Sequence, residues 1–378
     1  MEQLIGPCNN EPDRQPDEIP VVENPVEELS DKRTVTFSSD KSSVIITGSG
    51  IRIIKKSERL IVSYDGKILA ELPLFRLRTL QLRSTGILLS SDVVKVCCER
   101  HINIFFQNYA NRPYALLCSA TENRNAELLR GQFRYYESGL SGGLCRSFIL
   151  GKINNQRNVL KYGIKNLQQD DPARVEIEKI LKEMYKFYIQ LKLMPDGNID
   201  IMRYKIMGCE GKSAVLYWKA FAMLLKNPCG FEQRTTHGKT SDPVNALLNY
   251  GYAMLSNCVW NYILEAGLNP YAGFLHADEP GRLSLVYDLV EEFRAPVVDR
   301  TVLAYINRKK TSIVLNKDGL LPCEDRDTFT EKMLERIDSK ELYLQKHYQV
   351  KNIIKKQVYQ LANVIQWNKK YYPYTFKW

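Results

Sequence analysis

A histidine and two carboxylates in the second half of the chain have the types and spacing of a cation site. His276 ends the run 273–276, and an acidic loop that contains glycine and proline follows it. Apolar residues then recur at helical spacing through 282–294, so we expect a helix that carries Asp288 and Glu291 on one face. An imidazole beside such carboxylates suits a hard divalent cation. The simpler alternative is a histidine that caps this helix, next to an acidic face exposed to solvent.

Glu210 is a third acidic residue that this chemistry could use. It is the one acid in the stretch 207–218, and small residues surround it at positions 208, 211, 213 and 214. Small residues let a second backbone or a substrate approach closely. The alternative is a surface glutamate near the start of a helix, where its charge favours the helix dipole.

Other catalytic signatures are absent from the sequence. There is no P-loop, no G-x-G-x-x-G that opens a βα unit, no G-x-S-x-G and no H-E-x-x-H. The nine cysteines include no C-x-x-C pair, and an odd number without paired spacing fits neither a disulfide framework nor a zinc knuckle. We therefore expect reduced thiols and a cytoplasmic protein.

Composition and charge narrow the class of protein further. Hydrophobic residues make up 44% and charged residues 25%, which is typical of a soluble globular protein. No apolar run approaches the roughly 18 residues of a membrane helix, and the acidic start is unlike a signal peptide. The net charge is +10, but residues 1–40 carry −7, so the remainder carries +17. A basic body of this kind favours a polyanionic partner such as nucleic acid.

The elements that must position these residues fall into two domains of an α+β fold. Residues 1–41 are acidic and rich in proline, which predicts a flexible tail. Residues 42–121 predict a small β-sheet domain, because apolar and polar residues alternate there. Residues 122–378 predict a larger all-α helical domain with a basic C-terminal end. A length of 378 residues fits two domains better than one.

Local signals within this outline are specific. Asp65-Gly66 between two alternating runs predicts a tight hairpin, and 91–99 predicts a helix capped by Ser91 or Asp92. Asp242-Pro243 predicts a helix start, with proline in the first turn. The last long helix has one apolar stripe, and we expect its lysines to lie away from that stripe. Those lysines are Lys351, Lys355 and Lys356.

Several motifs follow one another in a fixed order along the chain. They are Cys209-Glu210-Gly211 through Tyr217-Trp218, then Arg234, Asp242-Pro243 through Tyr252, Gly273 through His276, and Tyr287 through Asp299. Together they resemble one known family, the CRISPR adaptation integrases. Pro73-Leu74 and 89–91 resemble the β domain of that family, and 129–132 resembles the opening of its helical domain. The resemblance extends over about 43–310, in the expected order.

The resemblance implies a metal-dependent DNA endonuclease and integrase that inserts new spacers into CRISPR arrays. It assigns the metal ligands to Glu210, His276 and Glu291 and makes Asp288 an auxiliary catalytic acid. It implies Mn²⁺ or Mg²⁺, double-stranded spacer and repeat DNA, a homodimer, and a small partner with a ferredoxin fold. In the family, the β domain contributes dimer and partner contacts.

Basic residues around these motifs are candidates for binding DNA phosphates. They are Arg130, Arg134, Arg146, Lys152, Arg157, Arg234, Arg282 and Arg294. For each of them the alternative is an ordinary solvated charge. Two other classes of protein remain open on the residues alone: a nucleic-acid-binding module without catalysis, and a scaffold that holds a partner.

Overall fold

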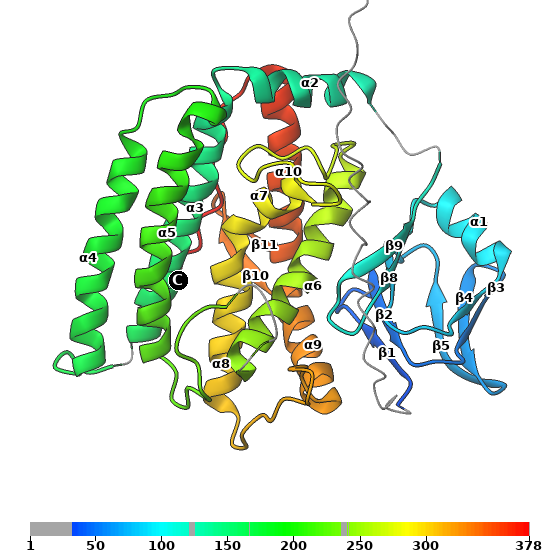
Figure 1. The fold of residues 1–378 in the computed structure, drawn as a ribbon. Coiled ribbons are helices and arrows are strands. Elements are labelled where there is room, and N and C mark those ends of the chain that lie inside the picture. The colour runs from blue at the N-terminus through cyan, green and yellow to red at the C-terminus, as the bar shows by residue number, and fades with distance from the viewer. Residues whose placement is uncertain (1–31, 121–124, 166, 236–239, 241, 378) are drawn as a thin grey trace, which may run out of the picture.

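The computed structural model describes residues 32–120, 125–165, 167–235, 240 and 242–377. A sheet domain and a helical domain lie side by side (Figure 1). The predicted α+β class, with a small sheet domain before a larger helical one, is confirmed. In the described chain, one hairpin, β10 (Lys340–Tyr343) with β11 (Lys346–Gln349), interrupts the helices of the second domain, so that domain is not purely helical.

The N-terminal domain consists of two sheets and one helix. The five-stranded sheet has the order β1 (Thr34–Phe37), β2 (Ser43–Thr47), β6 (Thr79–Leu82), β8 (Asn103–Gln107) and β9 (Pro113–Leu117). The four-stranded sheet has the order β5 (Lys67–Pro73), β4 (Arg59–Tyr64), β3 (Arg52–Lys56) and β7 (Leu88–Leu89). Inward-facing side chains such as Ile46, Ile53, Val62 and Leu80 form a shared core that is closed to water.

The hairpin and the short helix confirm two of the local predictions. Strands β4 and β5 pair antiparallel around Asp65 and Gly66, and both turn residues have positive φ, at 47° and 71°. A two-residue turn of this type needs positive φ at both positions, which Asp-Gly tolerates. Helix α1 spans Ser91–Glu99 as predicted, but its cap is Ser90, whose Oγ accepts from Val93 N at 3.4 Å. The cap therefore lies one residue before the predicted position.

The predicted boundary of the acidic tail is wrong at its C-terminal end. Residues 1–31 lie outside the described residues, but Thr34–Phe37 is the edge strand β1 and pairs antiparallel with β2. Val35 and Phe37 pack against the core of the sheet domain. A four-residue strand is too short to establish an alternating pattern beside a strongly acidic segment, so composition concealed it.

The helical domain is built around one buried helix. Its helices are α2 (Ala126–Glu137), α3 (Ser141–Ile164), α4 (Pro172–Lys192), α5 (Ile199–Met223), α6 (Pro243–Glu265), α7 (Ser284–Phe293), the π-helix η1 (Arg294–Asp299), α8 (Arg300–Arg308), α9 (Cys323–Asp338) and α10 (Val350–Trp367). Helix α6 is buried along most of its length. It begins as predicted, because Asp242 accepts from Asn245 N at 2.8 Å and Pro243 follows. Helix α3 packs against α4, α5 and α7 (Figure 1). Side chains from α3, α5 and α7 can therefore meet, although these helices are far apart in the sequence.

The last helix corrects one charge prediction. Its apolar stripe is buried as expected, but Lys351 is buried too, at 7% exposure. Its Nζ lies 2.6 Å from Asp338 at the end of α9 and 2.6 Å from Asp40 in the sheet domain. Two carboxylates offset the desolvation of this lysine. The residue therefore joins the two domains and does not belong to a free basic face.

Candidate metal centre

Three helices bring two of the predicted ligands together around a lysine. Lys152 on α3 places its Nζ 2.5 Å from Glu210 Oε1 on α5 and 2.6 Å from Glu291 Oε2 on α7. Gly151 permits this arrangement, because a Cβ there would lie 2.7 Å from Pro373 Cβ and 3.2 Å from Glu292 Cγ. Close approach of α3 to α7 thus depends on the glycine next to the lysine. The glutamates, 81 residues apart, share one cation.

The glycines beside Glu210 leave open space on that face of α5. An added Cβ at Gly208 or Gly211 would meet nothing within 4 Å, so among the described residues no second backbone approaches there. Close approach of a substrate stays a prediction.

Burial and neighbouring charges set the protonation states of Glu291 and Lys152. Burial raises the pKa of Glu291, but Arg294, Lys152 and His276 outweigh it and hold the pKa at about 2. Burial lowers the pKa of Lys152, and the charges of Glu291 and Glu210 raise it by more. Both groups are therefore ionised at neutral pH. Arg294 Nε adds a further contact at 3.4 Å to Glu291 Oε1.

His276 is held by the fully buried carboxylate of Asp288. Asp288 Oδ2 accepts from the backbone N–H of Phe274 at 2.6 Å and of Leu275 at 3.1 Å. Its Oδ1 accepts from His276 N at 3.0 Å and lies 2.7 Å from His276 Nδ1. This contact leaves Nε2 as the ring nitrogen that can coordinate a metal. All four of these contacts join Asp288 to the loop 274–276, and its predicted role as an auxiliary catalytic acid stays a prediction.

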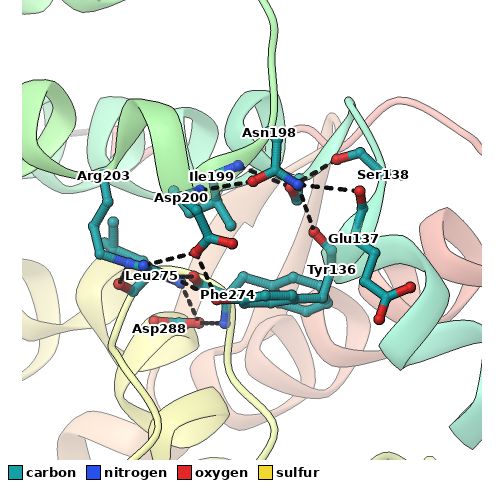
Figure 2. Close-up of polar contacts among 11 residues, drawn as sticks. Tyr136, Glu137, Ser138, Asn198, Ile199, Asp200, Arg203, Phe274, Leu275 and Asp288 are labelled. Atoms are coloured by element: carbon teal, nitrogen blue, oxygen red, sulfur yellow. Dashed lines mark hydrogen bonds and ion pairs between the residues drawn. The ribbon is translucent and has the colours of Figure 1, made fainter.

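Arg203 holds the same loop from its other side (Figure 2). Its Nε donates to Leu275 O at 3.0 Å, and Nη2 donates to Phe274 O at 3.1 Å and to Tyr136 Oη at 2.9 Å. Asp200 anchors the guanidinium at 2.9 Å. Asp288 thus binds the N–H groups of the loop while Arg203 binds its carbonyls. Sequence reasoning missed Arg203; its only signal is its place two helical turns before Glu210 on the same helix.

The three predicted ligands are not gathered into one closed cluster. In the part of the chain that the structure describes, no three His, Cys, Asp or Glu side chains form a group that could hold a metal ion. Glu210 and Glu291 meet at Lys152, and His276 lies near enough to Glu291 to lower its pKa. His276 also packs edge-on against the Tyr287 ring at 6.0 Å.

A cavity of about 170 Å³ adjoins Glu210. Lys152, Arg234 and Arg294 line it, and both arginines lie over the ring of Tyr252, at 5.4 Å and 4.8 Å. Its floor includes Asp299, which accepts from the hydroxyls of Tyr217 and Tyr252. The cavity therefore combines three cations beside the two glutamates.

The π-helix η1 carries Arg294 and Asp299, which both line this cavity. Pro296 has no N–H, so it cannot bond the carbonyl of Glu292 four residues earlier. Asn155 Nδ2 donates to that carbonyl instead, at 2.7 Å. The wider η1 turn follows, a feature often found at functional sites. Pro296 was the sequence signal for this break.

The other predicted DNA-binding residues have varied surroundings. Arg130 and Arg134 are exposed on α2. Arg146 bonds the carbonyl of Met194 and Asp196, and Arg282 pairs with Glu279 at 2.5 Å. Arg157 stacks on Tyr185 at 4.6 Å. Only Lys152, Arg234 and Arg294 of the predicted set line the cavity beside the glutamates, as far as the described residues extend.

Comparisons with known proteins identify the family. The family model described as CRISPR associated protein Cas1 matches residues 44–335. A CRISPR-associated endonuclease Cas1 from Francisella tularensis subsp. novicida is 32% identical over 345 residues, which is 89% of this chain and 99% of that protein.

Solved structures agree on the fold. A casposase bound to integration product has a TM-score of 0.73 and 19% identity, covering 88% of this chain and 92% of that one. A chain of a Cas6-RT-Cas1–Cas2 complex has a TM-score of 0.72 and 19% identity, covering 92% of this chain and 37% of that one.

Fold and site together define an α+β protein whose helical domain gathers acidic and basic side chains at one buried point. The chain belongs to the CRISPR-associated Cas1 family, as its sequence motifs indicated. No helix in the described part of the chain has the length and apolarity needed to cross a membrane. None of the cysteines described is bridged.

Proposed function

We propose that this protein is a divalent-metal-dependent DNA endonuclease and integrase. It would insert short duplex DNA into a CRISPR array through attack of a 3′-hydroxyl on a phosphodiester, in antiviral adaptive defence. The single observation that carries the proposal is a pair of carboxylates, the half-buried Glu210 and the buried Glu291, that both contact the cation of Lys152. Their arrangement already accommodates positive charge, beside a histidine whose orientation is fixed.

The donor set fits Mn²⁺ or Mg²⁺. Carboxylate oxygens are preferred by both ions, and one imidazole nitrogen suits Mn²⁺ as well. Glu210, Glu291 and His276 would hold the metal, and Lys152 would give up its place between the glutamates. When bound, the metal supplies Lewis-acid stabilisation of charge on the attacking and leaving oxygens.

The remaining residues prepare the site for a phosphodiester. Asp288 keeps the proton of His276 on Nδ1 and so presents Nε2. Arg294 contacts Glu291, and with Arg234 it lines the cavity where DNA phosphates would be neutralised. Lys152, once released from the glutamates, would be available to the same phosphates.

The proposed partners are double-stranded DNA, a second copy of this chain, and a small partner with a ferredoxin fold. The Cas6-RT-Cas1–Cas2 structure, with which the fold is shared, contains Cas1 together with Cas2. The casposase with the same fold is bound to an integration product. We propose a cytoplasmic location, because the DNA substrates are found there.

An integration assay tests the proposed function. Purified protein, the small partner, a supercoiled CRISPR plasmid and short duplex DNA are incubated with Mn²⁺, and joined products are counted. Glu210→Gln and Glu291→Gln should each reduce joining by about 100-fold or more, because the charge of one ligand is lost. Glu279→Gln, an exposed glutamate near His276, is the matched control and should retain joining.

Two results would contradict the proposal. Joining by Glu210→Gln at the wild-type rate would remove that residue from the metal site. Absence of joining by wild type, together with a melting temperature that Mn²⁺ does not change, would favour a binding module or a scaffold.

A further inference from the structure

Two arginines between the domains are buried without an acidic partner. Arg83, directly after β6, is 1% exposed, and Arg326, in the first turn of α9, is 5% exposed. Within the described chain, Nε and Nη2 of Arg83 and Nε of Arg326 have no hydrogen-bond partner. Carboxylates near them on α9 are engaged elsewhere, since Asp325 pairs with Lys309 at 2.5 Å and Asp327 with Lys32 at 3.9 Å.

The contacts that these arginines do make are neutral. Arg83 Nη1 donates to Thr330 Oγ1 at 3.3 Å, and its guanidinium lies 5.5 Å from the centre of the Tyr250 ring. Arg326 Nη2 lies 3.3 Å from Cys323 Sγ, and its guanidinium lies 5.3 Å from the Tyr109 ring. Thr330 joins the two groups through Tyr250 Oη and Arg326 O, both at 2.8 Å.

Such an arrangement is costly unless an anion completes it. Removing a cation from water without a counter-charge is unfavourable even after the protein relaxes. Burial lowers the pKa of Arg83, and the charge of Arg326 lowers it further, although Tyr250 and the more distant charge of Asp327 oppose this. A guanidinium remains protonated nonetheless. The two arginines therefore create a positive potential inside the molecule.

A cavity of about 480 Å³ gives an anion access to this potential. The buried Arg326 and the exposed Arg112, from the turn between β8 and β9, both line it. Tyr109 and Tyr250 supply aromatic walls, and Asn108 and Asn249 supply amide groups. The one acid in the described lining, Asp318, is exposed, so water screens its charge.

We propose that this interdomain cavity is a phosphate-binding site for a nucleotide, either free or as part of a nucleic-acid strand. Arg326 and Arg112 would contact the phosphate, and Arg83 would stabilise it from behind. The volume suits a mononucleotide. The site does not include the glutamates of the candidate metal centre, so the proposal does not rest on the proposed function.

Binding measurements on the full chain test this site. Inorganic phosphate, dAMP and a short single-stranded oligonucleotide are titrated by calorimetry into wild type, Arg112→Gln and Arg326→Gln. Each variant should bind dAMP or the oligonucleotide about tenfold or more weakly, because a charge-assisted contact is lost. Arg52→Gln, at another exposed arginine, on β3, is the matched control and should bind as wild type does. Glu210→Gln should also bind normally, which separates this site from the metal centre.

The ligands distinguish the source of the phosphate. Saturable binding of dAMP that both variants weaken supports a free nucleotide, and binding of the oligonucleotide alone supports a strand. Arg83→Met adds a second readout: it should raise the melting temperature in phosphate-free buffer and reduce the rise that dAMP produces in wild type. Equal affinities of Arg112→Gln and Arg52→Gln, or no binding of any probe by wild type at millimolar concentration, would overturn the proposal.

Discussion

Two regions of the molecule bury cations, and they treat them in opposite ways. At the candidate metal centre, Lys152 lies between two ionised glutamates. At the domain interface, Arg83 and Arg326 have only neutral partners in the described chain. The first region pairs its cation with two carboxylates, which a metal ion could bind in its place. The second region leaves its cations without a contacting carboxylate, so an anion would complete it.

Lys152→Met should have the largest effect on stability and on the response to metal. It removes the cation from between Glu210 and Glu291, so Glu291 keeps its contact with Arg294 and Glu210 loses its ion pair. Breaking a buried ion pair in this way costs about 3 kcal/mol. We expect that loss in urea unfolding without metal, and a larger rise in melting temperature on adding Mn²⁺ than in wild type. Lys161→Met on the same helix is the control; an equal metal response in all three proteins would contradict the prediction.

Asp288→Asn should have the next largest effect. The carboxylate accepts bonds from three backbone N–H groups and contacts His276 Nδ1, and an amide cannot accept all of them. We expect a loss of about 2 kcal/mol in unfolding free energy. Nitrogen NMR should also show that His276 no longer keeps its proton on Nδ1. A purely structural role for Asp288 would lower stability and leave that tautomer unchanged.

Asp299→Asn should remove part of the pH dependence of stability. Burial raises the pKa of Asp299 above its ordinary value, against the opposing hydroxyls of Tyr252 and Tyr217. The folded state therefore keeps a proton that the unfolded state loses as pH rises above about 4. Stability is full below that pH and falls by up to about 1.4 kcal/mol per pH unit until the raised pKa is passed. The asparagine variant should lack this slope, measured by urea unfolding from pH 4 to 8; an unchanged slope would assign it to another group.

Deletion of residues 1–31 should have the smallest effect. The segment holds nine acidic residues and one basic residue, so it would compete weakly with DNA for the basic body. We expect a slight rise in DNA affinity at low salt that disappears at high salt. Deletion of 1–41 also removes β1 and should lower the melting temperature. Equal stability of both truncations would show that β1 contributes nothing to the fold.

Local signals made much of the fold predictable. Asp65-Gly66, the helix 91–99 and Asp242-Pro243 depend on residues a few positions apart, so sequence alone located them. Strand β1 pairs with nearby β2, but its four residues are too few to show an alternating pattern beside the acidic segment. The burial of Lys351 depends on Asp40, 311 positions away, and no periodicity reports such a partner.

The candidate site, too, was only partly predictable from the sequence. Residue types and a family resemblance selected Glu210, His276 and Glu291, but not what surrounds them. Lys152 contacts glutamates 58 and 139 positions away, and Arg203 reaches a loop about 70 positions away. Only packing of α3, α5 and α7 brings these groups together. The unpartnered arginines were equally invisible, because the absence of a counter-charge is a property of the folded chain.

The most direct test of the central claim is a crystal structure of the protein with Mn²⁺, located by anomalous scattering. We predict one Mn²⁺ bound by Glu210 and Glu291, with His276 Nε2 as a further ligand and the Lys152 ammonium displaced from between the glutamates. Manganese at another place, with Lys152 still joining Glu210 and Glu291, would contradict the assignment of this centre.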